Sequence, residues 1–415
     1  MKLSIRGERL SGESGTLRLM EDLGRAMAEG DQYMLGGGNP ALIPEVMAVW
    51  KQRVRELLEE GPGFDRMLGC YDSPRGNPEF IKCFAQYARN RLRWPVDEQN
   101  IVITGGSQGG FFNLFNLLAG EKADGGTGRI LLPISPEYIG YANQHLDEGV
   151  FHSLRPLIEE TTQHGFKYRI DFEALREVES ASLICLSRPT NPSGNVVAES
   201  DLLRLYQESR RLDIPLVLDN AYGIPFPGII FGDVKPFWKP GIISSFSLSK
   251  LGLPATRTGI MVGPEELISR IVAMNANTSL AIGSIGQALV APMLNDGSLD
   301  KLCKDVIRPY YRARLKDSLA ALEESFKDRF EYRVHETEGS MFLWIWFPKL
   351  RCTDLELYHK LKRRKVLVIP GSFFFFGLQS KWPHSHQCIR VNYSHDPVMV
   401  RKGLEIIADT VAKNC

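Results

Sequence analysis

Short apolar runs alternate with amphipathic stretches through the middle of the chain, from about residue 100 to residue 261. The runs that we expect to form strands are residues 101–104, 129–134, 182–187, 215–219, 241–247 and 258–263. They are short and almost wholly apolar, which is typical of strands that helices cover on both faces. The alternation therefore predicts an α/β fold with a mostly parallel central sheet in a large domain.

One of the amphipathic stretches, residues 200–212, carries Leu202, Leu205 and Leu212 at roughly helical spacing. It begins with Ser200, and serine is a favourable N-cap because its hydroxyl accepts a backbone N–H of the first turn. We expect a helix here that crosses from one strand to the next, with Ser200 as its N-cap.

After residue 309 the pattern changes to a long charged helix (310–327), an alternating strand (341–347), further strands at 366–371 and 388–394, and a terminal helix. This pattern predicts a smaller α+β domain. We expect three parts: an N-terminal segment 1–48, which forms an arm and part of the small domain; a large domain 49–305; and a C-terminal small domain 306–415.

Composition narrows the class of protein. The 50 basic and 49 acidic side chains nearly cancel, so no overall charge favours nucleic acid or an anionic membrane surface. No apolar stretch is long enough for a membrane span or resembles a signal peptide, so we expect a cytoplasmic protein. The 7 cysteines are scattered without a CxxC pair, which favours reduced thiols. Small molecules are the expected partners.

The segment SFSLSK, which ends at Lys250, follows one of the expected strands. A lone lysine is most often a surface charge. Here, however, Ser247, Ser249 and Arg257 lie close in sequence and supply hydroxyl and guanidinium donors suited to a phosphate dianion. A phosphate site beside a reactive amine is what an enzyme of pyridoxal phosphate (PLP) requires.

A second strand end, PLVLDNAYG, places Asp219 and Tyr222 just after an apolar run. Asp219 could simply cap a following helix. In a PLP enzyme it would instead face the protonated ring nitrogen of the cofactor, and Tyr222 would reach the ring oxygen. The loop SRPTNPSGN is a tight turn by composition, and its Asn191 could contact the same ring oxygen.

Other candidates are weaker when taken singly. Ser107 and Gln108 lie at a Gly-rich turn before an apolar helix, where backbone N–H groups favour phosphate, although such turns are common in α/β proteins. Tyr138 could stack on a pyridine ring or belong to the core. Arg390, in a strand-like run, could bind a substrate carboxylate or pair with an internal Asp or Glu.

Two further features are better explained by structural roles than by functional ones. The cluster His384, His386 and Cys388 could suggest a metal site, but no partner motif accompanies it, and we expect no metal. The aromatic run 373–376 could suggest a membrane-facing patch, but we expect it to line or support an apolar pocket.

Together the residues resemble those of the class I and II aminotransferases, which have PLP fold type I; the matching positions are Asn191, Asp219, Tyr222, Lys250, Arg257 and Arg390. The resemblance runs from about Met34 to the C-terminus. Within the family, the chain most resembles enzymes that act on valine and pyruvate. The segments that carry this narrower resemblance include MLGGGNPALIPE, DNAYGIPFPGIIF and SLSKLGLP.

The resemblance implies a role for each matching residue. Lys250 would bind PLP covalently and act as the catalytic base, and Asp219 would pair with the ring nitrogen. Asn191 and Tyr222 would contact the ring oxygen. The phosphate would be bound by Ser107, Gln108, Ser247 and Arg257, and the ring face would be covered by Tyr138. Gly38 and Arg390 would contact the substrate. The family members are usually homodimers, and Tyr71 would reach the phosphate in the partner subunit.

The resemblance implies a reaction that moves an amino group between valine or alanine and pyruvate or 2-oxoisovalerate. The apolar residues 224–226 and 373–376 agree with small apolar side chains on the substrate. Three alternatives stay open. The first is another PLP reaction on the same scaffold, such as a C–S lyase, a decarboxylase or a synthase acting at Cα or Cβ. The second is a PLP-binding transcriptional regulator, which the lack of a basic N-terminal module disfavours. The third is a nicotinamide oxidoreductase, which the missing GxGxxG disfavours.

Overall fold

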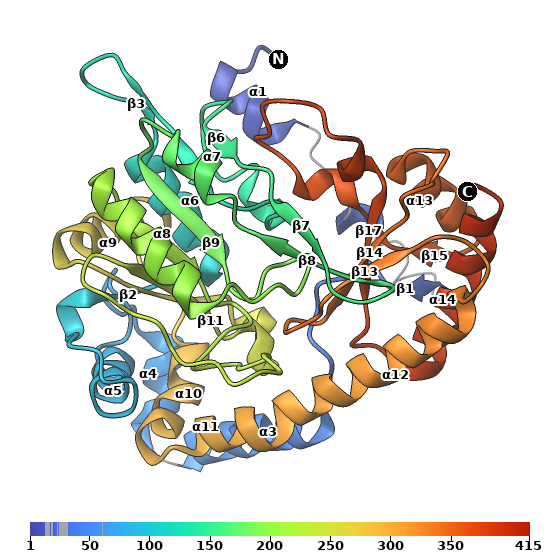
Figure 1. Cartoon of the computed structure of the whole chain (residues 1–415). Helices are drawn as coiled ribbons and strands as arrows, with labels where there is room; N and C mark the ends of the chain where they lie inside the picture. Colours follow the sequence, from blue (N-terminus) through green and yellow to red (C-terminus); the bar gives the residue numbers. More distant parts are fainter. Residues whose placement is uncertain (13–16, 18–19, 23, 25–31, 60) are drawn as a thin grey trace.

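The computed structural model describes residues 1–12, 17, 20–22, 24, 32–59 and 61–415, and its larger part is built on a seven-stranded sheet (Figure 1). The strand order is β2, β12, β11, β10, β9, β5, β6. The bounds are β2 Ile101–Gly105, β5 Ile130–Leu132, β6 Phe151–Ser153, β9 Leu183–Ser187, β10 Leu216–Asp219, β11 Ile243–Ser247 and β12 Thr258–Val262. Only β12 runs antiparallel to its neighbours. The predicted α/β fold with a mostly parallel sheet is confirmed.

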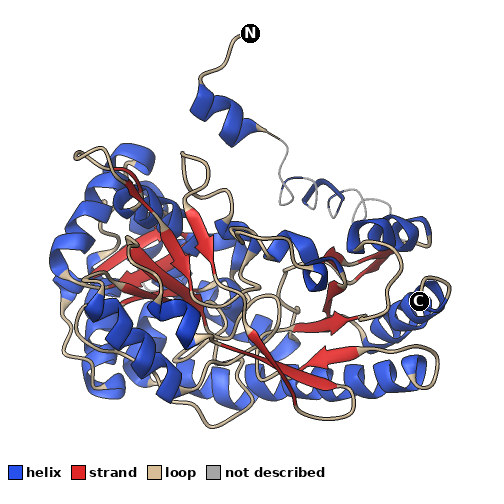
Figure 2. Ribbon diagram, turned by 45° about the horizontal axis from the view of Figure 1, so that its top comes forward, coloured by secondary structure: helices blue, strands red, loops and turns tan. Residues whose placement is uncertain are grey.

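Helices cover both faces of this sheet, which explains its apolar strands (Figure 2). The helices α6 (Gly106–Leu118) and α9 (Glu265–Ser279) form a core with one face. The helices α3 (Pro44–Glu59), α5 (Pro78–Tyr87) and α10 (Ile285–Asp296) contribute to the core on the other face. The shorter helices of this part are α4 (Pro62–Gly69), α7 (Phe172–Arg176) and α11 (Ser298–Lys301).

The crossover helix that we expected at 200–212 is α8, Glu199–Arg211, and it buries Leu202 and Leu205 against the sheet. Its N-cap prediction is wrong. The N-cap is Ala198, which makes no side-chain capping bond, and Ser200 lies inside the first turn. Acidic residues in that turn, Glu199 and Asp201, favour the helix start through the helix dipole instead.

The smaller part holds a six-stranded sheet in the order β16, β17, β14, β13, β8, β7. The bounds are β7 Leu157–Glu160, β8 Gly165–Arg169, β13 Arg333–His335, β14 Phe342–Trp346, β16 Ile369–Pro370 and β17 Cys388–Asn392. Its helices are α12 (Arg308–Phe326), α13 (Asp354–Arg363) and α14 (Pro397–Ala412). The helices predicted at 310–327 and at the C-terminus are thus present as α12 and α14.

Two segments from earlier in the chain join this smaller part. The β7–β8 hairpin lies at the edge of its sheet, where β8 pairs with β13. The strand β1 (Tyr33–Met34) pairs in parallel with β15 (Val366–Leu367). The proposed boundaries at residues 48 and 305 stay a prediction.

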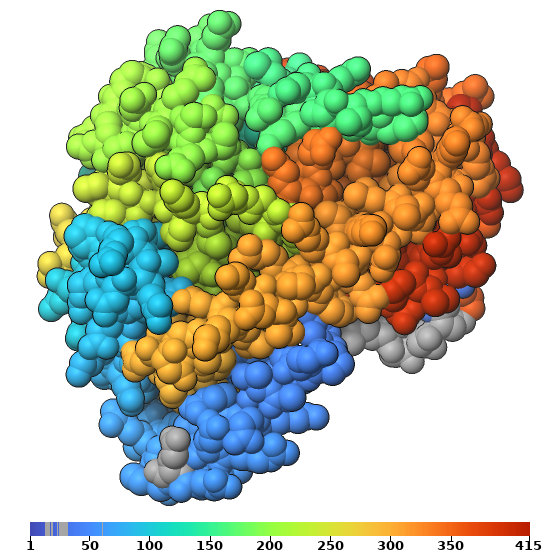
Figure 3. Space-filling view, turned by 60° about the horizontal axis from the view of Figure 1, so that its bottom comes forward, coloured from blue at the N-terminus to red at the C-terminus, as the bar shows by residue number. Residues whose placement is uncertain are grey.

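The long helix α12 connects the two parts and crosses one face of the molecule, next to the surface formed by α3 and α4 (Figure 3). The described N-terminus begins with α1 (Ile5–Ser11), where Arg6 forms an ion pair with Asp147. Among the described residues, no helix is both long and apolar enough to cross a membrane.

Candidate active site

The carboxyl ends of three adjacent strands bring the predicted catalytic residues together. In the register of the sheet, Asp219 on β10 lies opposite Ser187 on β9 and Ser245 on β11. The chain leaving β9 carries Asn191, and the chain leaving β11 carries Lys250. Ligands of open α/β sheets bind outside the carboxyl ends of the strands, so these residues occupy the expected place for a site.

Lys250 lies in a short turn after β11, and the residue is partly buried. Its ammonium Nζ donates a hydrogen bond to the carbonyl of Gly38 and lies 5.2 Å from the centre of the Tyr222 ring. Burial, with smaller contributions from Arg390 and Arg257, lowers the pKa of Lys250 to about 7. A large fraction of this amine is therefore neutral near neutral pH, as a nucleophile or base requires.

Asp219 is 6% exposed at the end of β10. Its Oδ2 accepts a 2.6 Å hydrogen bond from the hydroxyl of Tyr141, and its Oδ1 accepts one of 3.0 Å from the N–H of Ala221. Burial raises the pKa of Asp219 to about 6, and these hydrogen bonds limit the rise. The chain between β10 and β11 contains no helix, so the helix-cap explanation of Asp219 is wrong.

The first turn of α6 meets Arg257. In the sheet, Thr258 lies opposite Gly105, which places Arg257 beside the turn at Gly106. A Cβ on Gly106 would lie 2.2 Å from Nη2 of Arg257, so only glycine lets the guanidinium approach this closely. The N-terminal turn of a helix and a guanidinium side by side form a strong anion site.

Three predicted phosphate-binding side chains lie around this turn. The hydroxyl of Ser107 donates to the carbonyl of Phe246 at 3.3 Å, which places Ser107 against β11. Ser247 is 4% exposed, and its hydroxyl accepts a hydrogen bond of 3.2 Å from the N–H of Ser249. Gln108 donates through Nε2 to the carbonyl of Gly140 at 3.3 Å.

Tyr138 follows β5, and its hydroxyl donates to Oε1 of Gln108 at 3.4 Å. The ring packs so closely on Gly140 that a Cβ there would lie 2.3 Å from Cε1 of Tyr138. Burial raises the pKa of Tyr138, as does the negative charge of Asp219, and Arg390 and Arg257 oppose that rise. Tyr138 therefore lies within electrostatic range of the charged groups expected to contact the cofactor.

Arg390 is 3% exposed in β17, and its partners are neutral oxygens. Nη1 donates to Oδ1 of Asn191 and Nη2 to the carbonyl of Gly36, each at 2.7 Å. Its Nε has no hydrogen-bond partner among the described residues, and the guanidinium lies 4.0 Å from the centre of the Phe342 ring. A buried guanidinium held this way and lacking a carboxylate partner in the described chain suits an anionic substrate group.

Only part of the apolar segments 224–226 and 373–376, which were expected near the substrate, lies at the site, and the rest packs in the core. The ring of Phe374 lies 5.2 Å from the Arg390 guanidinium, beside the site. Phe375 instead packs against Trp382, and Phe376 against Phe151. Phe226 packs in the core with Phe84, Tyr87 and Phe246, so it does not line the site.

Of the residues considered as a metal site, His384 and Cys388 belong to a buried network at the smaller sheet, whereas His386 is exposed, with Nδ1 3.3 Å from Oδ1 of Asp354. Nε2 of His384 lies 2.5 Å from the hydroxyl of Tyr168, which also accepts a 2.9 Å hydrogen bond from the Trp344 indole. Cys388 also contacts His384. Among the residues that the structure describes, no group of three or more His, Cys, Asp and Glu side chains is placed to hold a metal ion.

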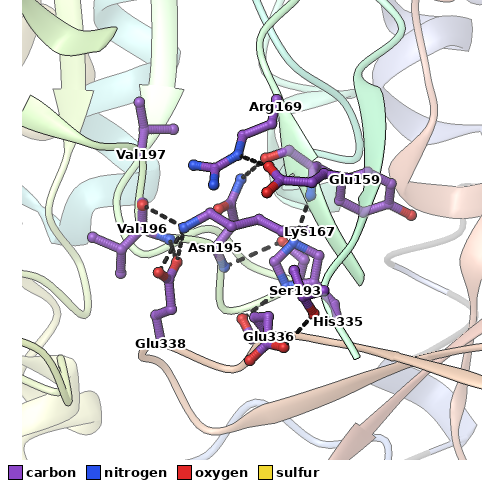
Figure 4. Close-up of polar contacts among 12 residues, drawn as sticks. Glu159, Lys167, Arg169, Ser193, Asn195, Val196, Val197, His335, Glu336 and Glu338 are labelled. Atoms are coloured by element: carbon purple, nitrogen blue, oxygen red, sulfur yellow. Dashed lines mark hydrogen bonds and ion pairs between the residues drawn. The ribbon is translucent and has the colours of Figure 1, made fainter. Parts of the chain in front are cut away.

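A neighbouring polar cluster joins the loop after Asn191 to this smaller sheet (Figure 4). Nζ of Lys167 on β8 lies 2.6 Å from both carboxylate oxygens of Glu338. Glu338 Oε2 also accepts the N–H of Val196, and Asn195 donates to the Tyr168 carbonyl. The loop is thus fixed from behind by the smaller sheet.

Comparison with known proteins identifies the family. A family model for the class I and II aminotransferases matches residues 32–407. Valine–pyruvate aminotransferase of Escherichia coli (strain K12) is 43% identical over 413 residues, which cover 100% of this chain and 99% of that protein. This chain belongs to the class I and II aminotransferases.

Solved structures agree with this family. The crystal structure of valine–pyruvate aminotransferase from Salmonella typhimurium LT2 has 42% sequence identity and a TM-score of 0.88, and the match covers 95% of this chain and 98% of that one. A putative amino-acid aminotransferase from Psychrobacter arcticum 273-4 has 36% identity and a TM-score of 0.97, covering 100% and 99%. The aminotransferase therefore shares its whole fold with these relatives.

The family uses PLP, and the donor set of this aminotransferase fits that cofactor. A glycine turn packed on Arg257 at the start of α6 suits the phosphate. The buried carboxylate of Asp219 suits a protonated ring nitrogen, and Lys250 supplies an amine whose pKa is lowered to about 7. Each chemical part of the cofactor thus has a complementary group in the chain.

Two buried residues of the aminotransferase site were missed by sequence reasoning. Tyr141 contacts Asp219, and Glu137 accepts hydrogen bonds from Ser187 and Tyr138. The only sequence signal for Glu137 is that it is a charged residue in an otherwise apolar and proline-rich stretch. Tyr141 carries no such signal, because an aromatic residue there is equally compatible with the core.

Proposed function

We propose that this aminotransferase uses PLP, bound covalently by Lys250, to move amino groups between valine or alanine and pyruvate or 2-oxoisovalerate. The observation that carries the proposal is the placement of Lys250, whose amine contacts Gly38 and Tyr222 and has its pKa lowered to about 7 by burial and by Arg390 and Arg257. A partly buried lysine within electrostatic range of two guanidinium groups has little structural use, whereas a reactive amine needs this environment.

When bound, PLP supplies an electron sink that stabilises negative charge on the substrate α-carbon. In our proposal Asp219 keeps the ring nitrogen protonated, and Asn191 and Tyr222 contact the ring oxygen. Tyr138 stacks on the ring face. The phosphate is held by Ser107, Gln108, Ser247 and Arg257.

Lys250 has two tasks in this proposal. It would hold the cofactor between turnovers, and as a free amine it would take the proton from the substrate α-carbon and deliver it to carbon C4′ of the cofactor. The guanidinium groups of Arg257 and Arg390 favour the neutral amine, since a like charge nearby disfavours protonation.

Substrate orientation is assigned to Arg390, which binds the α-carboxylate while Gly38 lies beside the substrate through its backbone. The Nε of Arg390, which no described residue hydrogen-bonds, and the nearby rings of Phe342 and Phe374 support a carboxylate site with an apolar surround. The similarity to valine–pyruvate aminotransferases supports a small apolar side chain on the donor.

We also propose a homodimer in which Tyr71 reaches the phosphate in the partner subunit. Tyr71 is 85% exposed, so its side chain is available to contact a partner subunit. The division of the chain at residues 48 and 305 and a cytoplasmic location complete the proposal.

The test is a visible absorption spectrum of the purified protein with added PLP, repeated with Lys250→Ala. We expect a band from the lysine-bound cofactor that the variant lacks. Product analysis with alanine or valine plus a 2-oxo acid then separates transamination from lyase, decarboxylase or synthase chemistry. A wild-type protein that gives no band with excess PLP would refute the proposal.

A further inference from the structure

Glu137 is a buried acid next to the proposed cofactor site, and the reaction described above does not use it. It has no exposed surface and lies between the end of β5 and Tyr138. Burying a carboxylate is costly unless hydrogen-bond donors compensate for lost water, so its presence calls for a local reason.

The carboxylate of Glu137 accepts three hydrogen bonds from two residues. Oε1 accepts the N–H of Ser187 at 2.7 Å. Oε2 accepts the hydroxyl of Ser187 at 2.7 Å and the N–H of Tyr138 at 2.9 Å. Such charge-assisted bonds to an ionised carboxylate are about twice as strong as neutral ones, which makes this a rigid contact.

These bonds join the surfaces that would enclose the cofactor. Tyr138 is the proposed stacking ring, and Ser187 begins the loop that carries Asn191. The backbone N–H of Glu137 also donates to the carbonyl of Phe374 at 3.0 Å, beside the proposed substrate site. Glu137 thus joins its own segment, with Tyr138, to two parts of the chain that are distant in sequence, at Ser187 and at Phe374.

We propose that Glu137 is a positioning residue, whose carboxylate holds Tyr138 and the loop at Ser187 in a fixed relation and so sets the slot for the cofactor ring. The inference rests on the proposed function, since the slot has meaning only if PLP binds there. Glu137 itself touches neither cofactor nor substrate in this assignment.

Glu137 holds Tyr138 and the loop at Ser187 in place when its carboxylate is ionised. Burial and the charge of Asp219 raise its pKa to about 7, while its bonds from Ser187 and Tyr138 oppose that rise. A protonated carboxyl would turn one acceptor oxygen into a donor, and an N–H of Ser187 or Tyr138 would lose its partner. The other titratable groups near enough to interact are Tyr141 and Cys185.

The substitution Glu137→Gln tests this with little change of shape. A glutamine has one acceptor oxygen, so in either orientation its NH₂ group faces the N–H of Ser187 or that of Tyr138. We expect the dissociation constant for PLP to rise about tenfold or more and kcat to fall about as much. The visible circular dichroism of bound PLP should also change, because it reports the ring's contact with Tyr138.

Two further variants make the experiment specific. Ser187→Ala removes one of the three donors and should give the same changes to a smaller degree, and it carries the test if Glu137→Gln does not fold. The matched control is Asp22→Asn, another buried acid, 4% exposed, which contacts Tyr358 and Lys362 on α13. Asp22→Asn should lower the melting temperature of the apoprotein without changing PLP affinity or the circular dichroism signal.

The outcomes separate the two proposals. If the wild type binds PLP, and both Glu137→Gln and Ser187→Ala match it in affinity and circular dichroism, the positioning role is wrong and the proposed function stands. If Asp22→Asn alters PLP binding as much as Glu137→Gln does, the effect is general destabilisation and the role is again wrong. Failure of the wild type to bind PLP overturns both.

Discussion

The hydroxyl of Tyr141 donates a 2.6 Å hydrogen bond to Oδ2 of Asp219, behind the proposed position of the cofactor ring. This bond and the N–H of Ala221 favour the ionised carboxylate, whereas burial favours the neutral one. Asp219 can pair with a protonated ring nitrogen only when it is ionised. Tyr141 is therefore expected to keep Asp219 functional near neutral pH.

The variant Tyr141→Phe tests that expectation. Without its donor, the pKa of Asp219 should rise further above about 6, because burial remains and one compensating bond is gone. The acidic limb of the kcat/KM profile should move to higher pH, with about a tenfold loss of activity at pH 7. The control is Tyr206→Phe on α8, which removes a hydroxyl that donates to the Pro240 carbonyl and should leave the profile unchanged.

Removal of the Asp219 carboxylate itself should reduce activity more than the loss of the Tyr141 hydroxyl does. Asp219→Ala should reduce kcat by about a thousandfold or more, since the ring nitrogen would lose the group that keeps it protonated. The fold should persist, because the substitution also removes a buried acid whose pKa is raised to about 6. Steady-state kinetics and far-ultraviolet circular dichroism check both parts. Near-normal turnover would mean that another group faces the ring nitrogen.

Lys250 should reduce the stability of the apoprotein. Its pKa is lowered from 10.5 to about 7, so between these values the unfolded chain binds a proton that the folded chain does not. The free energy of unfolding then rises with pH across this window. Lys250→Met should stabilise the apoprotein by about 1–3 kcal/mol at pH 7, with the gain decreasing toward pH 10. Urea unfolding at several pH values measures this, and a gain that is independent of pH would contradict the assigned cause.

Six of the seven strands of the central sheet could be predicted, because each is an apolar run that helices cover on both faces. The edge strand β6, with the sequence FHS, was missed. The same rule could not find the β7–β8 hairpin, because β7 is largely exposed and its sequence LIEE carries no such signal. Ser200 was a plausible cap by residue type, but the helix begins one residue earlier, at Glu199.

The residues of the site likewise include some that could be predicted from the sequence and some that could not. Lys250, Asp219 and Asn191 follow apolar runs directly, so their place at strand ends could be predicted from local sequence. Tyr141 and Glu137 act through partners far along the chain, Asp219 and Ser187. Only the order of the sheet, in which β9 lies between β5 and β10, brings them together. No local pattern records such contacts.

The ion pair between Lys167 and Glu338 supports the loop after Asn191, and its two members should differ in importance. Lys167 is the more deeply buried, with 9% of its side chain exposed against 36% for Glu338. Glu338→Gln leaves a buried positive charge without its partner and weakens the contact to the Val196 N–H. Lys167→Met leaves a carboxylate that solvent can reach.

We therefore expect Glu338→Gln to lower the free energy of unfolding by about 1–3 kcal/mol, and Lys167→Met by less than half of that. The double variant should be less destabilised than the sum of the two single variants, because each single change already breaks the pair. Urea unfolding of all four proteins measures the coupling. Strictly additive losses would show that the two side chains contribute independently.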